Sequence, residues 1–383
     1  MPPGPGTTQA PGRAPEDCHP GIGFKQFVAL MAALMAVTAF SIDAMLPVLP
    51  QIGDSLRIAS DNDQQWVVTA FLLGFGAAQL VYGPLSDRYG RRLVLLAGLA
   101  LFVVFSVAAV FAASLQAMIA ARALAGTGAA ATRVLAISII RDCYSGRRMA
   151  RVMSLVFIVF LAAPVVAPIM GQAIAMVGSW QWIFGALAAF GMATAGWAAL
   201  KLPETLNPAD RRAISPAGLV EALGIVVTSR MALGYMLAST AVFGSLFGFI
   251  NSAQQVFAEA LEAPELFTTV FALAAGCMAM ASFLNSRIVE RIGTRRVSHA
   301  ARLGFIAASG VHALVALAGD ESLWTFALLQ SVTMFFFGLV GVNFNAMAME
   351  PLGRIAGTGS SVLGAVTTVG GALIGFYVGQ QFD

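Results

Sequence analysis

Charged residues inside long apolar segments are the first candidates for chemistry in this 383-residue chain, because a charge placed within a membrane costs about 2.5–3.5 kcal/mol. Asp43 lies roughly 27 Å along a helix counted from Lys25. A carboxylate that faces a cavity at this depth can trade a proton for a cationic or polar substrate. The alternative is an acid near the membrane surface that reaches water, with Pro47 ending the helix.

Two arginines of the fourth apolar segment, Arg122 and Arg133, are eleven residues apart and share a helical face. Gly126 and Gly128 follow Arg122 by about one turn, so its guanidinium can lie in a tight interface and face a cavity or a carboxylate. Arg122 can instead extend to the membrane surface along its aliphatic chain. For Arg133, the roles of structural anchor and of pore residue are equally compatible with the sequence.

The loop between the second and third apolar segments concentrates charge where one membrane helix turns back as the next. This charged hinge contains Gly83, Asp87, Arg88, Gly90, Arg91 and Arg92. Arg141 and Asp142 end the fourth segment on the same side of the membrane. A charged hinge of this kind favours a membrane transporter whose halves move over a soluble enzyme.

The fifth apolar segment contains Pro164 and Pro168, followed by Gly171. A proline inside a helix frees a carbonyl and bends the helix, which neighbouring membrane helices tolerate. The segment can therefore pivot against its partner; a static bend is the alternative.

Neutral polar residues of the second half form a further candidate group. Asn251 and Gln255 are its main members, and it also contains Ser252, Gln254, Asn343 and Asn345. These side chains can line a substrate path or form hydrogen bonds between helices.

Several other kinds of function find no support in the sequence. The three cysteines and three histidines are scattered, without a CxxC motif, so we expect neither a disulfide framework nor a metal site. The motif GxxxxGK[ST] is missing, so we expect no ATP-hydrolysing site, and no cofactor is expected. The net charge is +3, but the arginines cluster at the ends of apolar segments, which argues against nucleic acid as a partner.

The elements that position these residues are membrane helices, so the predicted fold class is an all-α membrane protein. Hydrophobic residues make up 58% of the chain and charged residues 11%, against about 25% charged residues in soluble domains. A bilayer core needs roughly 20 apolar residues in a helix. Eleven segments of this kind are predicted, at about 25–50, 64–84, 93–113, 117–140, 150–173, 180–200, 231–256, 266–285, 298–318, 322–346 and 356–379.

Lysine and arginine lie almost entirely on one side of these segments, which places the amino terminus and the long central loop in the cytoplasm. The predicted organisation is a disordered cytoplasmic tail (1–22), an N-terminal six-helix bundle (23–200), a cytoplasmic linker (201–229) and a C-terminal bundle of about five helices (230–383). The stretch from Asn285 to Arg296 is a weak repeat of the loop from Asp87 to Arg92, which suggests two halves of similar build.

Several motifs agree in order with a known family. The pattern Gly83-x-Leu85-Ser86-Asp87-Arg88-x-Gly90-Arg91-Arg92 resembles the cytoplasmic loop motif of the major facilitator superfamily. The stretch from Arg122 to Gly128 is similar to the fourth-helix motif of this superfamily. The stretch from Ala167 to Gly171 is similar to the fifth-helix motif of its antiporters, and the stretch from Pro203 to Leu206, after the sixth segment, also fits the superfamily. More narrowly, Ser41 to Pro50 and Met349 to Thr358 look like the Bcr/CflA drug-resistance subfamily.

The resemblance implies the major facilitator fold, with two six-helix bundles as pseudo-repeats, and proton-driven export of drugs such as bicyclomycin, chloramphenicol or sulfonamides by alternating access. It implies that Asp43 and Arg122 line the cavity. It also implies a cytoplasmic gate, in which Asp87, Arg91 and Asp142 lock the outward-open state. The candidate gate residues are Gly83, Asp87, Arg88, Gly90, Arg91, Arg92, Arg141 and Asp142. The expected partners are a small-molecule drug, protons and the lipid bilayer of the bacterial inner membrane, and we expect a monomer.

The chain departs from the family pattern at two points. Ala167 and Gln172 stand where many antiporters have glycine in the fifth helix. The sequence stops after its eleventh segment, whereas the family has twelve, so we expect a missing twelfth helix. The alternatives to drug export are a facilitator or importer of a small metabolite and a truncated fragment that does not transport.

Overall fold

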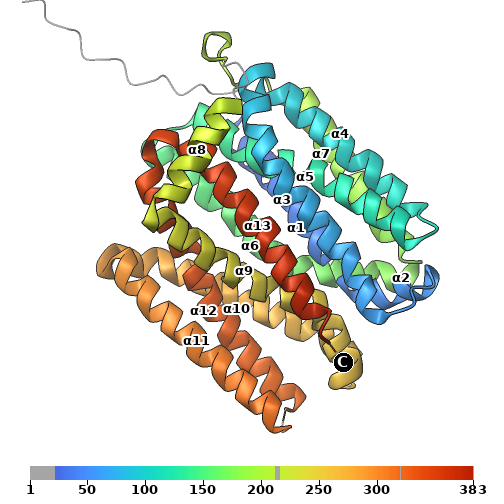
Figure 1. Cartoon of the computed structure of the whole chain (residues 1–383). Coiled ribbons are helices and arrows are strands. Elements are labelled where there is room, and N and C mark those ends of the chain that lie inside the picture. The colour runs from blue at the N-terminus through green and yellow to red at the C-terminus, as the bar shows by residue number, and fades with distance from the viewer. Residues whose placement is uncertain (1–21, 212–215, 320, 383) are drawn as a thin grey trace, which may run out of the picture.

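The computed structural model describes residues 22–211, 216–319 and 321–382, which form a bundle of long helices (Figure 1). The helices of the first half are α1 (Phe24–Asp43), α2 (Leu49–Ser55), α3 (Trp66–Tyr89), α4 (Arg91–Val110), α5 (Leu115–Cys143), α6 (Gly146–Val177) and α7 (Gln181–Lys201). Those that follow are α8 (Pro216–Thr228), α9 (Arg230–Gln255), α10 (Phe267–Ile292), α11 (Thr294–Ala318), α12 (Leu323–Met349) and α13 (Ala356–Gly379). The tail predicted over 1–22 lies outside the described residues, apart from Ile22.

Short helical turns join some of these helices. They are η1 (Leu46–Val48), η2 (Asp61–Gln65), η3 (Pro208–Asp210), the π-helical turn η4 (Val256–Ala260), η5 (Pro264–Leu266) and η6 (Glu350–Ile355). The described part of the chain contains no strand, which confirms the all-α prediction. Eleven of its helical segments are long and apolar enough to cross a membrane, and they match the eleven predicted segments.

The predicted linker between the two halves, residues 201–229, contains a helix that the sequence analysis did not predict. Its second part forms helix α8. Val226 of α8 is 1% exposed and packs with Leu352 and Leu363 near the start of α13. Prolines and arginines dominate the beginning of this stretch, whereas Leu219 to Val227 is mostly apolar and too short to cross a membrane.

Glycine allows the helices of the first half to approach closely. A Cβ atom on Gly74 of α3 would strike the carbonyl oxygen of Ala123 in α5, and one on Gly126 of α5 would strike the carbonyl oxygen of Phe71 in α3. Because lipid tails are as apolar as the helix surfaces, the hydrophobic effect does little to bring membrane helices together, and close packing becomes a main source of their association. The positions of α3 and α5 are therefore fixed by backbone contact.

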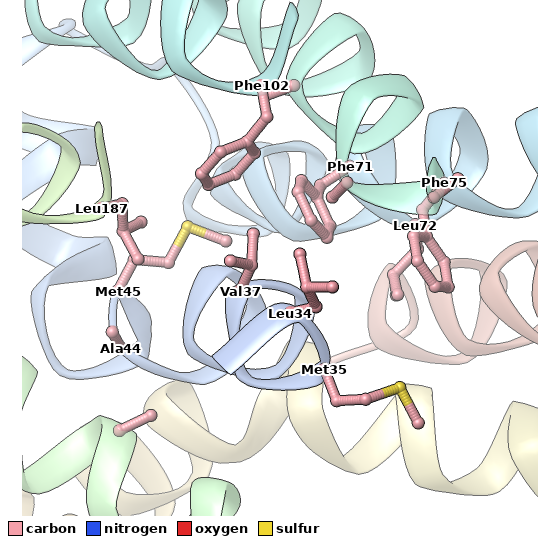
Figure 2. Close-up of a cluster of buried hydrophobic side chains, with 14 of the residues drawn as sticks. Leu34, Met35, Val37, Ala44, Met45, Phe71, Leu72, Phe75, Phe102 and Leu187 are labelled. Carbon is pink, nitrogen blue, oxygen red and sulfur yellow. The ribbon is translucent and has the colours of Figure 1, made fainter. Parts of the chain in front are cut away.

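Apolar side chains fill the space between α1, α3 and α4. Figure 2 shows Leu34 and Val37 rising from α1 toward Phe71 of α3, with Phe102 of α4 beside them. Leu34, Val37, Phe71 and Phe102 are all fully buried. This core holds α1, whose last residue is Asp43, at a fixed height against α3.

The two halves meet mainly through α3 against α13 and α6 against α10. Figure 1 shows α13 lying next to α3, although the two helices are far apart in the sequence. We call the end of the bundle that carries the α3–α4 turn the Arg91 end. The opposite end, where α3 begins, is called the Gln65 end.

Candidate functional site

Arg91 is the centre of a charged cluster at the Arg91 end. Its guanidinium donates hydrogen bonds to Asp87 Oδ1 at 2.6 Å, to Ser86 Oγ at 2.6 Å and to Asp142 Oδ2 at 2.9 Å. Arg91 is 4% exposed, Asp142 16% and Asp87 40%. The structure thus brings together Asp87, Arg91 and Asp142, which the family resemblance grouped as the lock of the gate, and ties the end of α3 to the end of α5. Their role as a gate stays a prediction.

Glu204, which follows α7, is part of the same cluster and was not among the predicted site residues. Its carboxylate accepts hydrogen bonds from the backbone N–H groups of Arg91 at 2.8 Å and Arg92 at 3.3 Å, the first residues of α4. It also accepts bonds from the N–H groups of Thr205 and Leu206. A carboxylate at a helix N-terminus satisfies free N–H groups and interacts favourably with the helix dipole.

Gly90 makes this arrangement possible, since its φ of 98° lies in the region that favours glycine. A Cβ atom at Gly90 would also clash with the Glu204 carboxylate. Arg92 donates to the carbonyl oxygen of Ala199 in α7 at 2.6 Å. The α3–α4 turn is therefore fastened to both α5 and α7, within the first half.

The other predicted gate residues lie on the surface around this cluster. Arg88 and Arg141 are exposed, and Arg88 lies over the ring of Tyr89. Gly83 faces α13: a Cβ atom added to Gly83 would lie 3.5 Å from Ser361 Oγ. A Cβ atom added to Gly357, at the start of α13, would lie 3.8 Å from Nη1 of Arg141. The Arg91 end thus touches the second half through small residues of α3 and α13.

Arg122 is fully buried within the first half. Its Nε donates to Val67 O of α3 at 3.0 Å and its Nη2 donates to Ser41 O of α1 at 2.7 Å. The guanidinium lies 4.4 Å from the ring centroid of Phe71, a cation–π contact. Arg122 therefore joins α1, α3 and α5 and lies beside the last turn of α1, two residues before Asp43. It does not extend to the membrane surface, which was the alternative.

Asp43 is 4% exposed and forms no hydrogen bond or ion pair with any residue that the structure describes. It ends α1, and the chain continues in η1. The next residue, Ala44, meets Gly171 of α6 so closely that a Cβ atom on Gly171 would strike the Ala44 carbonyl oxygen. The carboxylate therefore lies next to the contact between α1 and the predicted pivot helix.

The pivot helix α6 runs without interruption through Pro164 and Pro168. Arg133, the second arginine of α5, is half-buried with its guanidinium 5.9 Å from the ring centroid of Phe75. The cavity role of Arg133 and the pivot role of Pro164, Pro168 and Gly171 stay predictions.

Asn251 and Gln255, which the sequence placed along a substrate path, connect the two halves at the Gln65 end. Gln65 Nε2 of η2 donates to Gln255 Oε1 at 2.7 Å and to Gly379 O at 3.0 Å. Gln255 Nε2 donates in turn to Asn62 Oδ1 at 2.7 Å. Asn251 Nδ2 of α9 donates to Thr69 Oγ1 of α3 at 3.2 Å. Both predicted residues are buried between the halves.

The same network extends to the end of α13. Asn62 Nδ2 donates to Phe382 O at 2.9 Å, and Gln380 Nε2 donates back to Asn62 O at 2.7 Å. The ring of Trp66 packs against the ring of Phe376, with centroids 4.2 Å apart and planes tilted by 47°. Asn62 and Gln65 were not predicted as site residues. We call Asn62, Gln65, Gln255 and Gln380 the amide network.

Comparisons with known proteins agree with this architecture. The family model described as Major Facilitator Superfamily matches residues 30–375. The chain belongs to the major facilitator superfamily. A bicyclomycin resistance protein homolog from Haemophilus influenzae is 29% identical over 359 residues, which cover 93% of this chain and 89% of that protein. Multidrug resistance protein MdtL from Escherichia coli is 29% identical over 350 residues, which cover 91% of this chain and 87% of MdtL.

A crystal structure of a D-xylose-proton symporter shares the fold, with a TM-score of 0.73 and 14% sequence identity, covering 92% of this chain and 89% of that one. The expected resemblance to Bcr/CflA-type drug-resistance transporters is confirmed by the two relatives. This major facilitator protein is thus a multi-pass membrane protein with the fold of a transporter. In the described residues, no group of three histidine, cysteine or acidic side chains is placed to hold a metal ion.

Proposed function

We propose that this protein exports drug-like small molecules across the bacterial inner membrane in exchange for protons, by alternating access. The Arg91 end then faces the cytoplasm, in agreement with the positive-inside rule. The observation that carries the proposal is the buried Asp43 carboxylate, which has no ion-pair partner among the described residues. A carboxylate held inside a membrane protein in this way can receive a proton and a cationic or polar substrate in turn.

The surrounding contacts suggest how the protonation of Asp43 reaches the rest of the bundle. Arg122 holds the last turn of α1 through Ser41 O and the start of α3 through Val67 O. Gly171 of α6 touches the backbone at Ala44. A change of charge at Asp43 therefore acts on three helices at once: α1, α3 and α6. In this proposal α6 pivots at Pro164 and Pro168 while the two ends of the bundle open alternately.

The proposed substrates follow from the relatives. One is named for bicyclomycin resistance and another for multidrug resistance. Bicyclomycin, chloramphenicol and sulfonamides are therefore the first compounds to test, in a susceptibility panel with an efflux-deficient host. Intact cells that accumulate a compound when they express the protein would instead indicate an importer.

The proton role of Asp43 is tested by transport in vesicles with an imposed pH gradient. Asp43→Asn removes the titratable group at nearly constant volume, so we expect uphill drug export to be lost while downhill exchange of drug remains. Asp54→Asn is the matched control, because Asp54 is an exposed acid shortly after the same helix. Uphill export by the Asp43→Asn variant at the rate of the Asp54→Asn variant would contradict the proposal.

A further inference from the structure

Five arginines surround the turn between α10 and α11, and the structure leaves all of them exposed. They are Arg287, Arg291, Arg295, Arg296 and Arg302. The only acid in the same stretch, residues 287–302, is Glu290, so this surface has a formal charge of +4 (five arginines less one glutamate). None of the five forms an ion pair with an acidic residue that the structure describes. We call these five residues the arginine patch.

The equivalent turn of the first half uses its arginines differently. Gly90 and Gly293 occupy the same place before α4 and α11, with φ of 98° and 89°. Arg91 and Arg92, which follow Gly90, bond to Asp87, Asp142 and Ala199 inside the first half. In the second half, Thr294 stands where Arg91 would be, and Arg295 points outward. Among the residues that the structure describes, the charge of the arginine patch therefore does not join one helix to another.

The surface next to the arginine patch is apolar. Exposed large side chains of α10 and α11 near the turn are Phe283 (58%), Leu284 (39%), Ile292 (51%), Leu303 (62%) and Ile306 (59%). The guanidinium of Arg287 lies 4.7 Å from the ring centroid of Phe283, so the charge lies directly beside this apolar surface.

We propose that the arginine patch binds the headgroup phosphate of anionic phospholipids, whose acyl chains lie against the exposed apolar residues of α10 and α11. Arginine binds phosphate oxygens with two parallel hydrogen bonds, and several arginines in one place favour an anion over a zwitterion. A free phosphate ion would satisfy the arginines but leave Phe283 and Leu303 without a partner. Lipid matches both parts of the surface.

The patch also lies at the correct depth for a headgroup. Asn285 of α10 pairs with Asn343 near the end of α12, and α12 leads into the start of α13. The start of α13 faces Gly83 of α3, close to the α3–α4 turn. The arginine patch is therefore at the Arg91 end, where the membrane-crossing helices α10 and α11 leave and re-enter the bilayer.

Native mass spectrometry of the full-length protein in detergent tests the proposal, with phosphatidylglycerol and phosphatidylethanolamine as the added lipids. The patch variant carries Arg287→Gln, Arg291→Gln, Arg295→Gln and Arg296→Gln. The control variant carries Lys25→Gln, Arg147→Gln, Lys201→Gln and Arg211→Gln, four exposed cations elsewhere in the loops predicted to lie on the same side of the membrane. Both variants lose the same charge, so only the position differs.

Each arginine near a membrane surface strengthens the binding of anionic lipid about fivefold. We expect the patch variant to bind phosphatidylglycerol at least tenfold more weakly than the control variant, with no change for phosphatidylethanolamine. Replacement of the same four arginines by lysine should restore most of the binding. Equal losses of phosphatidylglycerol binding in the patch and control variants would overturn the proposal, as would unchanged binding in the patch variant. The measurement does not depend on transport, so it is independent of the proposed function.

Discussion

The two ends of the bundle are held in chemically different ways. At the Arg91 end, a buried arginine forms ion pairs with Asp87 and Asp142, and all three residues belong to the first half. At the Gln65 end, the amide network carries no charge, and its bonds run between the halves: Gln65 to Gln255, and Gln255 to Asn62. Charge thus fastens helices within one half, whereas neutral groups join the two halves.

This difference matches the cost of breaking each kind of contact. A hydrogen bond between neutral groups contributes about 0.5–1.5 kcal/mol net. The loss of one partner from a buried ion pair costs about 3–5 kcal/mol. Contacts that break and form again whenever the halves separate are best made from the weaker kind, and contacts that hold a half rigid from the stronger kind. The amide network therefore suits an interface that opens repeatedly.

The largest effect is expected from Arg91→Ala, which leaves the Asp142 and Asp87 carboxylates without their common partner. Asp87 is 40% exposed, so water replaces part of the interaction, and we expect a loss of stability of about 2–3 kcal/mol. A fall in the thermal unfolding midpoint of the detergent-purified protein measures it. Arg88→Ala is the control, because Arg88 is exposed and forms no ion pair with a described residue; its effect should stay within about 0.5 kcal/mol. Equal midpoints for the two variants would remove the distinction between the ends.

Gln65→Ala should have a smaller effect, and one of a different kind. It removes two hydrogen bonds between the halves, to Gln255 Oε1 and to Gly379 O. If their loss destabilises the closed Gln65 end by roughly 1.4 kcal/mol, the population in which this end is open rises about tenfold. The rate at which a thiol reagent labels Ala253→Cys, a fully buried position of α9, reports this opening in a background without other cysteines.

Gln51→Ala is the matched control, since Gln51 is an exposed glutamine of α2 without a hydrogen-bond partner among the described residues. If the Gln65→Ala and Gln51→Ala variants label Ala253→Cys at the same rate, the amide network does not hold this end closed. A lower unfolding midpoint without faster labelling would also count against that role, because it would indicate a contact that only stabilises the fold.

Much of the fold could be predicted from the sequence, because membrane helices are recognised from the length of apolar segments. All eleven segments were found in this way. The family resemblance placed Asp87, Arg91 and Asp142 in one cluster, and in the structure Arg91 bonds to both carboxylates, while their role as a gate stays a prediction. Helix α8 was missed because its apolar stretch is shorter than a membrane span and follows a polar one. Segment length carries no information about such a helix, which packs against α9, α13 and η6.

The amide network shows the limit of sequence-based prediction more clearly. Gln65 and Gln255 are 190 residues apart, and their pairing depends on how the two halves meet. Neither residue has a charge that would stand out inside an apolar segment. The sequence signal for Glu204 was its position as an acid just after the sixth apolar segment. Its bonds to the N–H groups of α4 could not be predicted, because they depend on the packing of α7 beside α4.

Glu204→Gln should give the smallest of the three effects. It compares a charged carboxylate with a neutral amide at one position of the Arg91 end. The glutamine keeps one oxygen that can accept from the Arg91 N–H, but it loses the negative charge that favours the N-terminus of α4. We expect a loss of about 1 kcal/mol, read from the thermal unfolding midpoint. Glu221→Gln in α8 is the control, because Glu221 is exposed. If the Glu204→Gln midpoint equals that of the control, hydrogen bonding without charge is sufficient at the Arg91 end, and the two ends of the molecule differ less than their composition indicates.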